Sequence, residues 1–155
     1  MLLSEVRKMQ TADNVARWFL SRNNLKFIAE DTEYISNLKL QKLLYYAQGM
    51  NLALYGKPLF EDAIVAWTHG PVVESVYQTY KSNGSEGIKS FQPPIENFTE
   101  EEEDTLQFTQ TNFGQFSAWK LREMTHNETP WLTTNRNQEI SVTKIKSYFE
   151  EHYVE

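Results

Sequence analysis

The segment from Ser36 to Gly56 reads SNLKLQKLLYYAQGMNLALYG, and it decides the fold class. Ser36 is a good helix N-cap, because its hydroxyl can accept a hydrogen bond from a backbone N–H group of the first turn. Gly56 and Pro58 end the helix. Between them, apolar side chains surround most of the helix instead of following one face, which indicates burial on more than one side. The sequence therefore predicts a central helix with other elements packed around it.

Further helices are predicted before and after this segment from their N-cap residues. Thr11 can cap a first helix, which we expect to end within Ser21 to Asn24. Thr99 and Glu102 form a capping box, and the acidic run beside them suits the positive end of a helix dipole. The other N-cap candidates are Ser117 and Ser141.

These elements predict a mostly α protein, a compact bundle of about six helices with a short strand or small hairpin. The chain has 155 residues, a length typical of one domain. We therefore expect a single domain over residues 1–155, with its core between about 11 and 150.

The strand and a turn are expected between Ala63 and Tyr80. Ala63 to Thr68 is a β-branched and aromatic run bounded by turn signals, which predicts a short strand. Gly70 followed by Pro71 predicts a helix start, because proline at the first helical position loses no useful hydrogen bond. The apolar positions of the helix that follows have helical spacing and are Val73, Val76, Tyr77 and Tyr80.

A corner is expected where this strand meets this helix. Trp67, His69 and the free backbone N–H groups of the helix N-terminus would converge there, an arrangement that can hold an anionic group. The simpler alternative is that His69 only hydrogen-bonds the turn and that Trp67 fills the core. The residue types leave both interpretations open.

The composition excludes several classes of function. The chain has no cysteine, which excludes thiolate nucleophiles and cysteine-based zinc sites. No apolar run approaches the roughly 18 residues that span a bilayer, and Met1 to Gln10 lacks the build of a signal peptide. We therefore expect a cytoplasmic protein without a membrane partner. The net charge of −6 argues against nucleic acid, and Lys39 and Lys42, which share one helical face, fit ordinary solvated lysines.

The histidines form no recognisable catalytic or metal-binding motif. His69, His126 and His152 are the only imidazoles in the sequence, and their spacing is not that of HExxH. Neither G-x-S-x-G nor the phosphate-binding G-x-x-x-x-G-K-[ST] occurs. His126 follows a predicted helix and can engage its last carbonyls, while Trp131 pins the loop. The sequence therefore assigns no catalytic, cofactor or metal residue.

Several short motifs, taken in order, resemble the Panacea domain family, also called the SocA-like or phage-associated GepA-like family. The resemblance covers roughly Val15 to Phe149 and rests on LKLQKLLYYA in the central helix, on Trp67 with Gly70-Pro71, and on Thr125-His126 with Pro130-Trp131. The motif positions that serve either the fold or the function are Lys39, Gln41, Lys42, Tyr45, Tyr46, Gly70, Pro71, His126 and Trp131.

The resemblance implies an antitoxin role, in which members neutralise unrelated toxins by direct binding and some act as degradation adaptors. It implies no catalytic residue. The leading hypothesis is therefore a toxin-neutralising binding module, not an enzyme, whose partner is a cognate toxin. Because aromatic side chains often anchor interfaces, we expect the contact residues to be Trp67, His69, Tyr77 and Tyr80. The alternatives are a hydrolase that uses His69, His126 and a carboxylate, and an orphan phage interaction protein.

Overall fold

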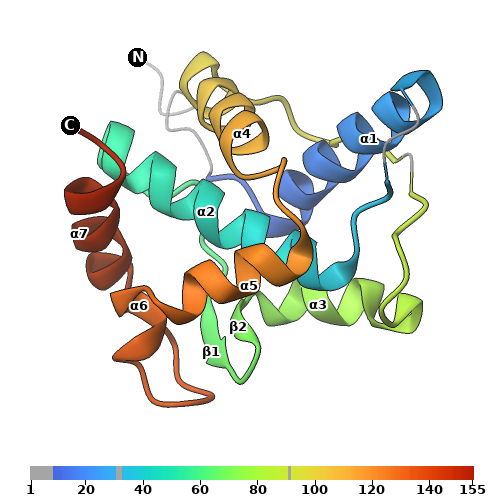
Figure 1. The fold of residues 1–155 in the computed structure, drawn as a ribbon. Coiled ribbons are helices and arrows are strands. Elements are labelled where there is room, and N and C mark those ends of the chain that lie inside the picture. Colours follow the sequence, from blue (N-terminus) through green and yellow to red (C-terminus); the bar gives the residue numbers. More distant parts are fainter. Residues whose placement is uncertain (1–8, 31–32, 91) are drawn as a thin grey trace.

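The computed structural model describes residues 9–30, 33–90 and 92–155, which form seven α-helices and one antiparallel hairpin. The mostly α fold is thus confirmed, with one helix more than expected (Figure 1). The helices are α1 (Ala12–Glu30), α2 (Asn37–Tyr55), α3 (Glu74–Tyr80), α4 (Glu100–Asn112), α5 (Ala118–His126), α6 (Thr129–Leu132) and α7 (Val142–His152). The strands are β1 (Val65–Trp67) and β2 (Gly70–Val72), and a 3-10 turn, η2 (Lys81–Asn83), follows α3.

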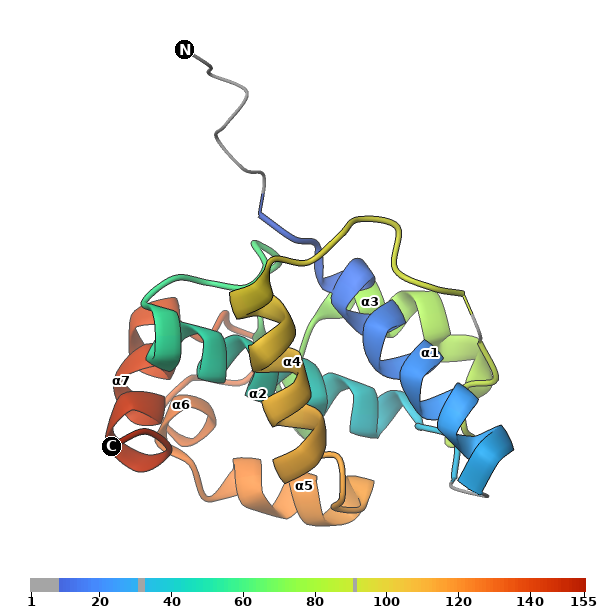
Figure 2. The same ribbon diagram turned by 90° about the horizontal axis from the view of Figure 1, so that it is seen from above.

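Helix α2 crosses the middle of the molecule and contacts most of the other elements (Figure 1). Helices α4, α5 and α7 and strand β2 make its most extensive contacts, and α1 and α3 also pack on it. Seen from above, α4 crosses over α2, with α1 and α3 at one end and α6 and α7 at the other (Figure 2). Fourteen of its residues are buried, so the prediction of a central helix enclosed on several sides is confirmed.

The predicted helix starts are also confirmed, because each capping residue bonds within its own first turn. The Ser36 hydroxyl accepts from the backbone N–H of Lys39 at 3.2 Å, and Gly56 ends α2 in a left-handed conformation with φ of 74°. Thr99 and Glu102 form both hydrogen bonds of a capping box. The other confirmed caps are Thr11, Ser117 and Ser141.

The expected end of α1 was wrong, because the helix continues past Ser21 to Asn24 as far as Glu30. Asn24 is buried there and donates to the carbonyls of Ile88 and Ser90, so this polar residue docks the helix instead of ending it. The sequence also predicts a polar, acidic connector around Glu30 to Glu33, and part of that connector lies outside the described residues.

The helix start predicted at Gly70-Pro71 was wrong as well. These residues belong to β2, where Pro71 pairs with Ala66 and Gly70 pairs with Trp67, and α3 begins only at Glu74. A proline is tolerated in a strand when no ladder hydrogen bond needs its missing N–H. The backbone N–H of Ala66 donates to the Gln138 carbonyl, and the Ala66 carbonyl accepts from Asn137.

The backbone N–H and carbonyl of Ala66 therefore point away from β2. Pro71 lies opposite Ala66 in a pair without hydrogen bonds, so its missing N–H leaves no partner unpaired. Residues 137–140 instead cover the far edge of β1, where the N–H of Ile140 also donates to the Ile64 carbonyl. The hairpin is thus flanked on its outer edge by a segment more than 70 residues later in the sequence, which no local pattern around Gly70-Pro71 indicates.

Close packing at Gly49 generates a prediction about the stability of the core. A Cβ atom at this position would lie 2.4 Å from Cζ of the buried Phe149 ring. Alanine normally stabilises a helix interior by about 1 kcal/mol relative to glycine. Here the clash outweighs that gain, and we expect Gly49→Ala to lower the free energy of unfolding by about 1 to 3 kcal/mol, as overpacking does.

Chemical denaturation of Gly49→Ala, Phe149→Leu and the double variant measures this effect. If the ring is the cause, the double variant is more stable than the sum of the two single changes predicts, because the smaller side chain removes the clash. Strict additivity, or a stabilised Gly49→Ala, contradicts the explanation.

Candidate partner-binding site

The β1–β2 hairpin is held on α2 by two polar side chains of that helix. The Gln41 Oε1 atom accepts from the backbone N–H of Val73 at 2.9 Å, and the Nζ atom of Lys42 donates to the Pro71 carbonyl at 3.0 Å. Gly70, with φ of 116°, permits this approach, since a Cβ there would lie 2.7 Å from Cε of Lys42. The hairpin is therefore seated on a buried polar face of α2.

The interpretation of Lys39 and Lys42 as solvated surface lysines was wrong for Lys42, which has no exposed surface. Burial, reinforced by the nearby Arg122, lowers the pKa of Lys42 to about 7. Lys39 is partly buried and donates to the Gly114 carbonyl at 2.7 Å, and burial lowers its pKa while Glu33 opposes that change. Both lysines hold neighbouring backbone in place.

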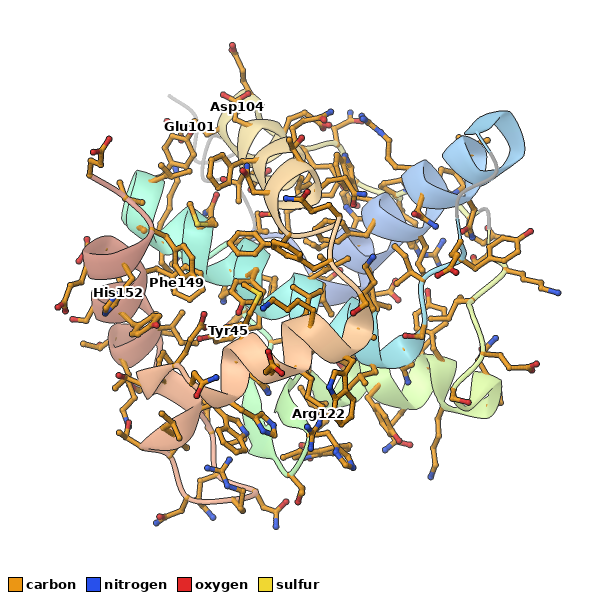
Figure 3. All side chains as sticks on the ribbon, in the orientation of Figure 1. Tyr45, Glu101, Asp104, Arg122, Phe149 and His152 are labelled. Atoms are coloured by element: carbon orange, nitrogen blue, oxygen red, sulfur yellow. The ribbon has the colours of Figure 1, made fainter. Side chains whose placement is uncertain are left out.

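The tip of the hairpin brings His69 against helix α5. His69 is exposed, and its Nδ1 atom accepts a hydrogen bond from Nε of Arg122 at 3.3 Å. The Arg122 guanidinium also lies over the Trp119 ring, with Cζ at 4.7 Å from the ring centroid. Figure 3 shows Arg122 beside the hairpin, where α5 passes it.

A second stack joins the end of α5, helix α6 and the loop after α6. The imidazole of His126 is parallel to the Trp131 ring, with centroids 4.0 Å apart, and the Arg136 guanidinium lies 3.8 Å from that ring. The Trp131 indole N–H donates to the Trp67 carbonyl at 2.7 Å, which ties this stack to β1. Trp131 thus does fix its segment, but that segment is helix α6 and not the loop that the sequence suggested.

Of the four expected contact residues, Trp67, His69 and Tyr77 lie near one another and Tyr80 does not. Trp67 meets Tyr77 edge to face at 4.8 Å between centroids, and its indole N–H donates to Glu74. His69 lies at the adjoining hairpin tip. Tyr80 is directed toward α1 instead: burial raises the pKa of its hydroxyl, and Asp13 raises it further. We use the term hairpin corner for Trp67, His69, Tyr77, Arg122 and Trp131.

The helix N-terminus on which the anion-binding interpretation of this corner depended does not follow His69. The backbone there is a strand, and α3 begins five residues after His69. The simpler alternative holds in part, since His69 bonds Arg122 and Trp67 packs on Tyr77.

A buried carboxylate, that of Glu128, was missed by the sequence analysis. Glu128 accepts hydrogen bonds from the hydroxyls of Tyr45 and Tyr46, each at 2.9 Å, and from the Tyr153 hydroxyl. Burial raises the pKa of Glu128, while the three hydroxyl donors oppose that rise. The network joins α2, the start of α6 and the C-terminal end of α7, so its role is to hold three elements together.

The hydrolase alternative needs a carboxylate beside His69 and His126. The main chain of His69 does lie next to the His126 imidazole. Burial lowers the pKa of His126, and the charged groups that lower it further are the cations Arg122, Lys42 and Arg136. Glu128 instead faces the tyrosine hydroxyls. The corner is therefore cationic and aromatic, and among the described residues it offers these imidazoles no acid partner.

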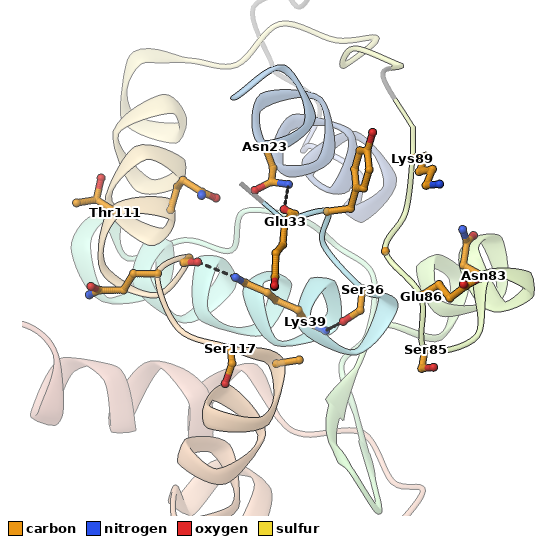
Figure 4. A pocket seen from close by; sticks show the side chains of 16 residues that line it. Asn23, Glu33, Ser36, Lys39, Asn83, Ser85, Glu86, Lys89, Thr111 and Ser117 are labelled. Carbon is orange, nitrogen blue, oxygen red and sulfur yellow. Dashed lines mark hydrogen bonds between the residues drawn. The ribbon is translucent and has the colours of Figure 1, made fainter. Parts of the chain in front are cut away.

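A polar groove of about 980 Å³ lies elsewhere, between the start of α2, residues 83–89 and the α4–α5 junction (Figure 4). Lys39 lines it, and none of Trp67, His69, Tyr77 or Tyr80 does. Within the described part of the chain, no group of three or more acidic or histidine side chains is placed to hold a metal ion. No helix among residues 9–30, 33–90 and 92–155 has the length and apolar character needed to cross a bilayer.

Residues 40–132, more than half of the chain, match the family described as "Antitoxin SocA-like, Panacea domain". The chain is also similar to Antitoxin SocA of Caulobacter vibrioides (strain NA1000 / CB15N), with 48% identity over 54 residues. This alignment spans 35% of the chain and 29% of the relative's own length. No solved structure matches the chain. All five residues of the hairpin corner fall within the matched range.

The buried amine of Lys42 generates a prediction about the pH dependence of stability. In the unfolded chain this amine stays protonated up to its ordinary pKa of 10.5, whereas in the folded protein it loses its proton near pH 7. Between these values the unfolded state binds more protons, so the free energy of unfolding rises with pH. We expect a rise of up to about 1.4 kcal/mol per pH unit from pH 7 to 9.

Chemical denaturation at several pH values in this range measures the slope. Lys42→Met should remove most of the rise, and Lys57→Met, a change at an exposed lysine, should leave it intact. Equal slopes in the wild type and Lys42→Met contradict the assignment.

Proposed function

The chain belongs to the family of SocA-like antitoxins with a Panacea domain, as its motifs indicated, and on this premise we propose that it neutralises a toxin by binding it directly at the hairpin corner. The observation that carries the proposal is that all five residues of the hairpin corner lie within residues 40–132, the range that matches the antitoxin family. The relative's alignment covers 29% of that protein, so direct binding is proposed here for this chain on its own geometry.

The chemistry of the corner supports a role in protein recognition. Tryptophan, tyrosine and arginine are the residue types that most often supply the energy of protein interfaces. Trp67, Tyr77, Arg122 and Trp131 are all partly exposed here, and His69 is exposed. The catalytic alternatives gain no comparable support, because the imidazoles are surrounded by cations.

The corner is also held in place before a partner arrives. Its hairpin is seated on Gln41 and Lys42, and the Trp131 indole fixes α6 to β1. A surface that is already ordered loses less conformational entropy on binding. Direct contact is required whether the bound toxin is blocked or delivered to a protease, so the same surface serves either mechanism.

Co-expression with the product of the neighbouring gene tests the proposal. The wild-type chain should rescue growth from that product and co-purify with it. His69→Ala and Tyr77→Ala should each weaken the complex about tenfold or more if they are interface anchors, whereas Gln107→Ala, on the exposed face of α4, should not.

Circular dichroism of each variant separates loss of contact from loss of fold. A harmless neighbouring product, or the absence of any complex with the folded wild-type chain, contradicts the proposal. Full binding by both corner variants contradicts the location of the surface.

A further inference from the structure

Two arginines, Arg122 of the hairpin corner and Arg136 beside it, are each stacked on a tryptophan. Arg122 lies over Trp119 and Arg136 lies over Trp131, with Cζ-to-centroid distances of 4.7 and 3.8 Å. Stacking fixes the plane of a guanidinium and leaves the N–H groups at its edge directed outward. The Nε atom of Arg122 donates a hydrogen bond to His69, and one terminal nitrogen of Arg136 donates to the Trp131 carbonyl.

The two stacks form one continuous surface, since Trp119, Arg122 and His126 have helical spacing and share one side of α5. His126 then stacks on Trp131, which carries Arg136. Trp119 is 64% exposed, and Leu132 of α6 is 53% exposed. We call this surface the arginine–tryptophan face, formed by Trp119, Arg122, His126, Trp131 and Arg136.

The charge of this face is opposite to that of the whole chain. The chain carries a net charge of −6, yet neither Arg122 nor Arg136 forms an ion pair with a carboxylate among the described residues. The nearby Glu123 pairs with Lys120, and Glu74 accepts from the Trp67 indole. The face therefore presents two stacked guanidinium groups without local compensation.

We propose that the arginine–tryptophan face binds an acidic segment of the partner protein, whose carboxylates meet Arg122 and Arg136 and whose apolar side chains cover Trp119 and Leu132. The geometry suits carboxylates because the planar fork of arginine donates a pair of parallel hydrogen bonds to the two oxygens of a carboxylate. The identity of the partner as a toxin rests on the proposed function, but the chemistry of the face does not.

The charge distribution favours an acidic protein segment over nucleic acid. A nucleic acid is a long polyanion whose binding draws on several cations placed along the backbone. This face offers two arginines on a chain with net charge −6, so a long polyanion would be repelled beyond the face. A short acidic segment of a folded partner meets the two arginines without following the rest of the surface.

The four tryptophan indole N–H groups allow a direct test by two-dimensional ¹H–¹⁵N NMR. Trp119 and Trp131 report on the face, and Trp18, whose indole N–H donates to Glu103 on α4, serves as the internal control. The probe is a synthetic peptide of Glu, Asp and Phe. A matched peptide with Gln and Asn in place of the acidic residues, and a single-stranded oligothymidylate, complete the set.

The acidic peptide should shift the Trp119 and Trp131 signals and leave the Trp18 signal in place, while the neutral peptide should shift none of the three. Arg122→Glu and Arg136→Glu should each weaken peptide binding by about tenfold or more, because like charges then face each other. Lys81→Glu, the same charge reversal at an exposed lysine of η2, should change the affinity by less than about twofold. An unchanged Trp18 signal shows that each variant is folded, and Arg122→Gln provides a milder change.

Equal shifts with the neutral peptide, tighter binding of oligothymidylate, or no shift with any probe overturns the inference. Two further outcomes distinguish the failure of this inference from the failure of the proposed function. A toxin complex that forms and is insensitive to Arg122→Glu and Arg136→Glu overturns this inference alone, whereas intact peptide binding without any toxin complex overturns the proposed function alone.

Discussion

Helix α2 is enclosed by other elements and still carries many polar side chains, so each of these must find a hydrogen-bond partner inside the protein. A buried polar group without a partner costs about 1 to 3 kcal/mol, which is a large part of the stability of a small domain. Gln48 meets the backbone of Leu59 and Phe60, and Asn51 meets Lys57 and Thr105. For the same reason Gln41 and Lys42 hydrogen-bond the backbone of the hairpin, and the hydroxyls of Tyr45 and Tyr46 donate to Glu128. The polar side chains of one helix thereby determine where the peripheral elements dock.

This constraint explains which parts of the structure follow from the sequence. The caps at Ser36, Thr99, Ser117 and Ser141 could be predicted because their hydrogen bonds close within three residues. The central helix could be predicted because its apolar residues surround it. The strand at Gly70-Pro71 could not, because the local helix signal is outweighed by Lys42, which lies nearly 30 residues earlier, and by the segment that occupies the far edge of β1.

The candidate site was predictable to a similar extent. The aromatic residues Trp67 and Tyr77 were found because strand and helix spacing placed them near one corner. Arg122 and Arg136 were missed by the sequence analysis, because each acquires its role only from the tryptophan on which it stacks in the fold. The role of Glu128 could not be predicted either, because its three hydroxyl partners lie far away in the sequence, in α2 and directly after α7.

Most of the motif residues stabilise the fold, which leaves contact with a partner to other residues. Gln41, Lys42, Tyr45, Tyr46, Gly70 and Pro71 are all buried and are occupied by contacts within the fold. Residues engaged in this way cannot also contact a partner without disrupting the core. Recognition therefore falls to the side chains that the scaffold leaves at its surface, such as His69 at the hairpin tip and Trp119 on α5. A change at such a position alters the contact surface while the buried network keeps the hairpin and α5 in place, so partner choice and fold stability are set by different residues.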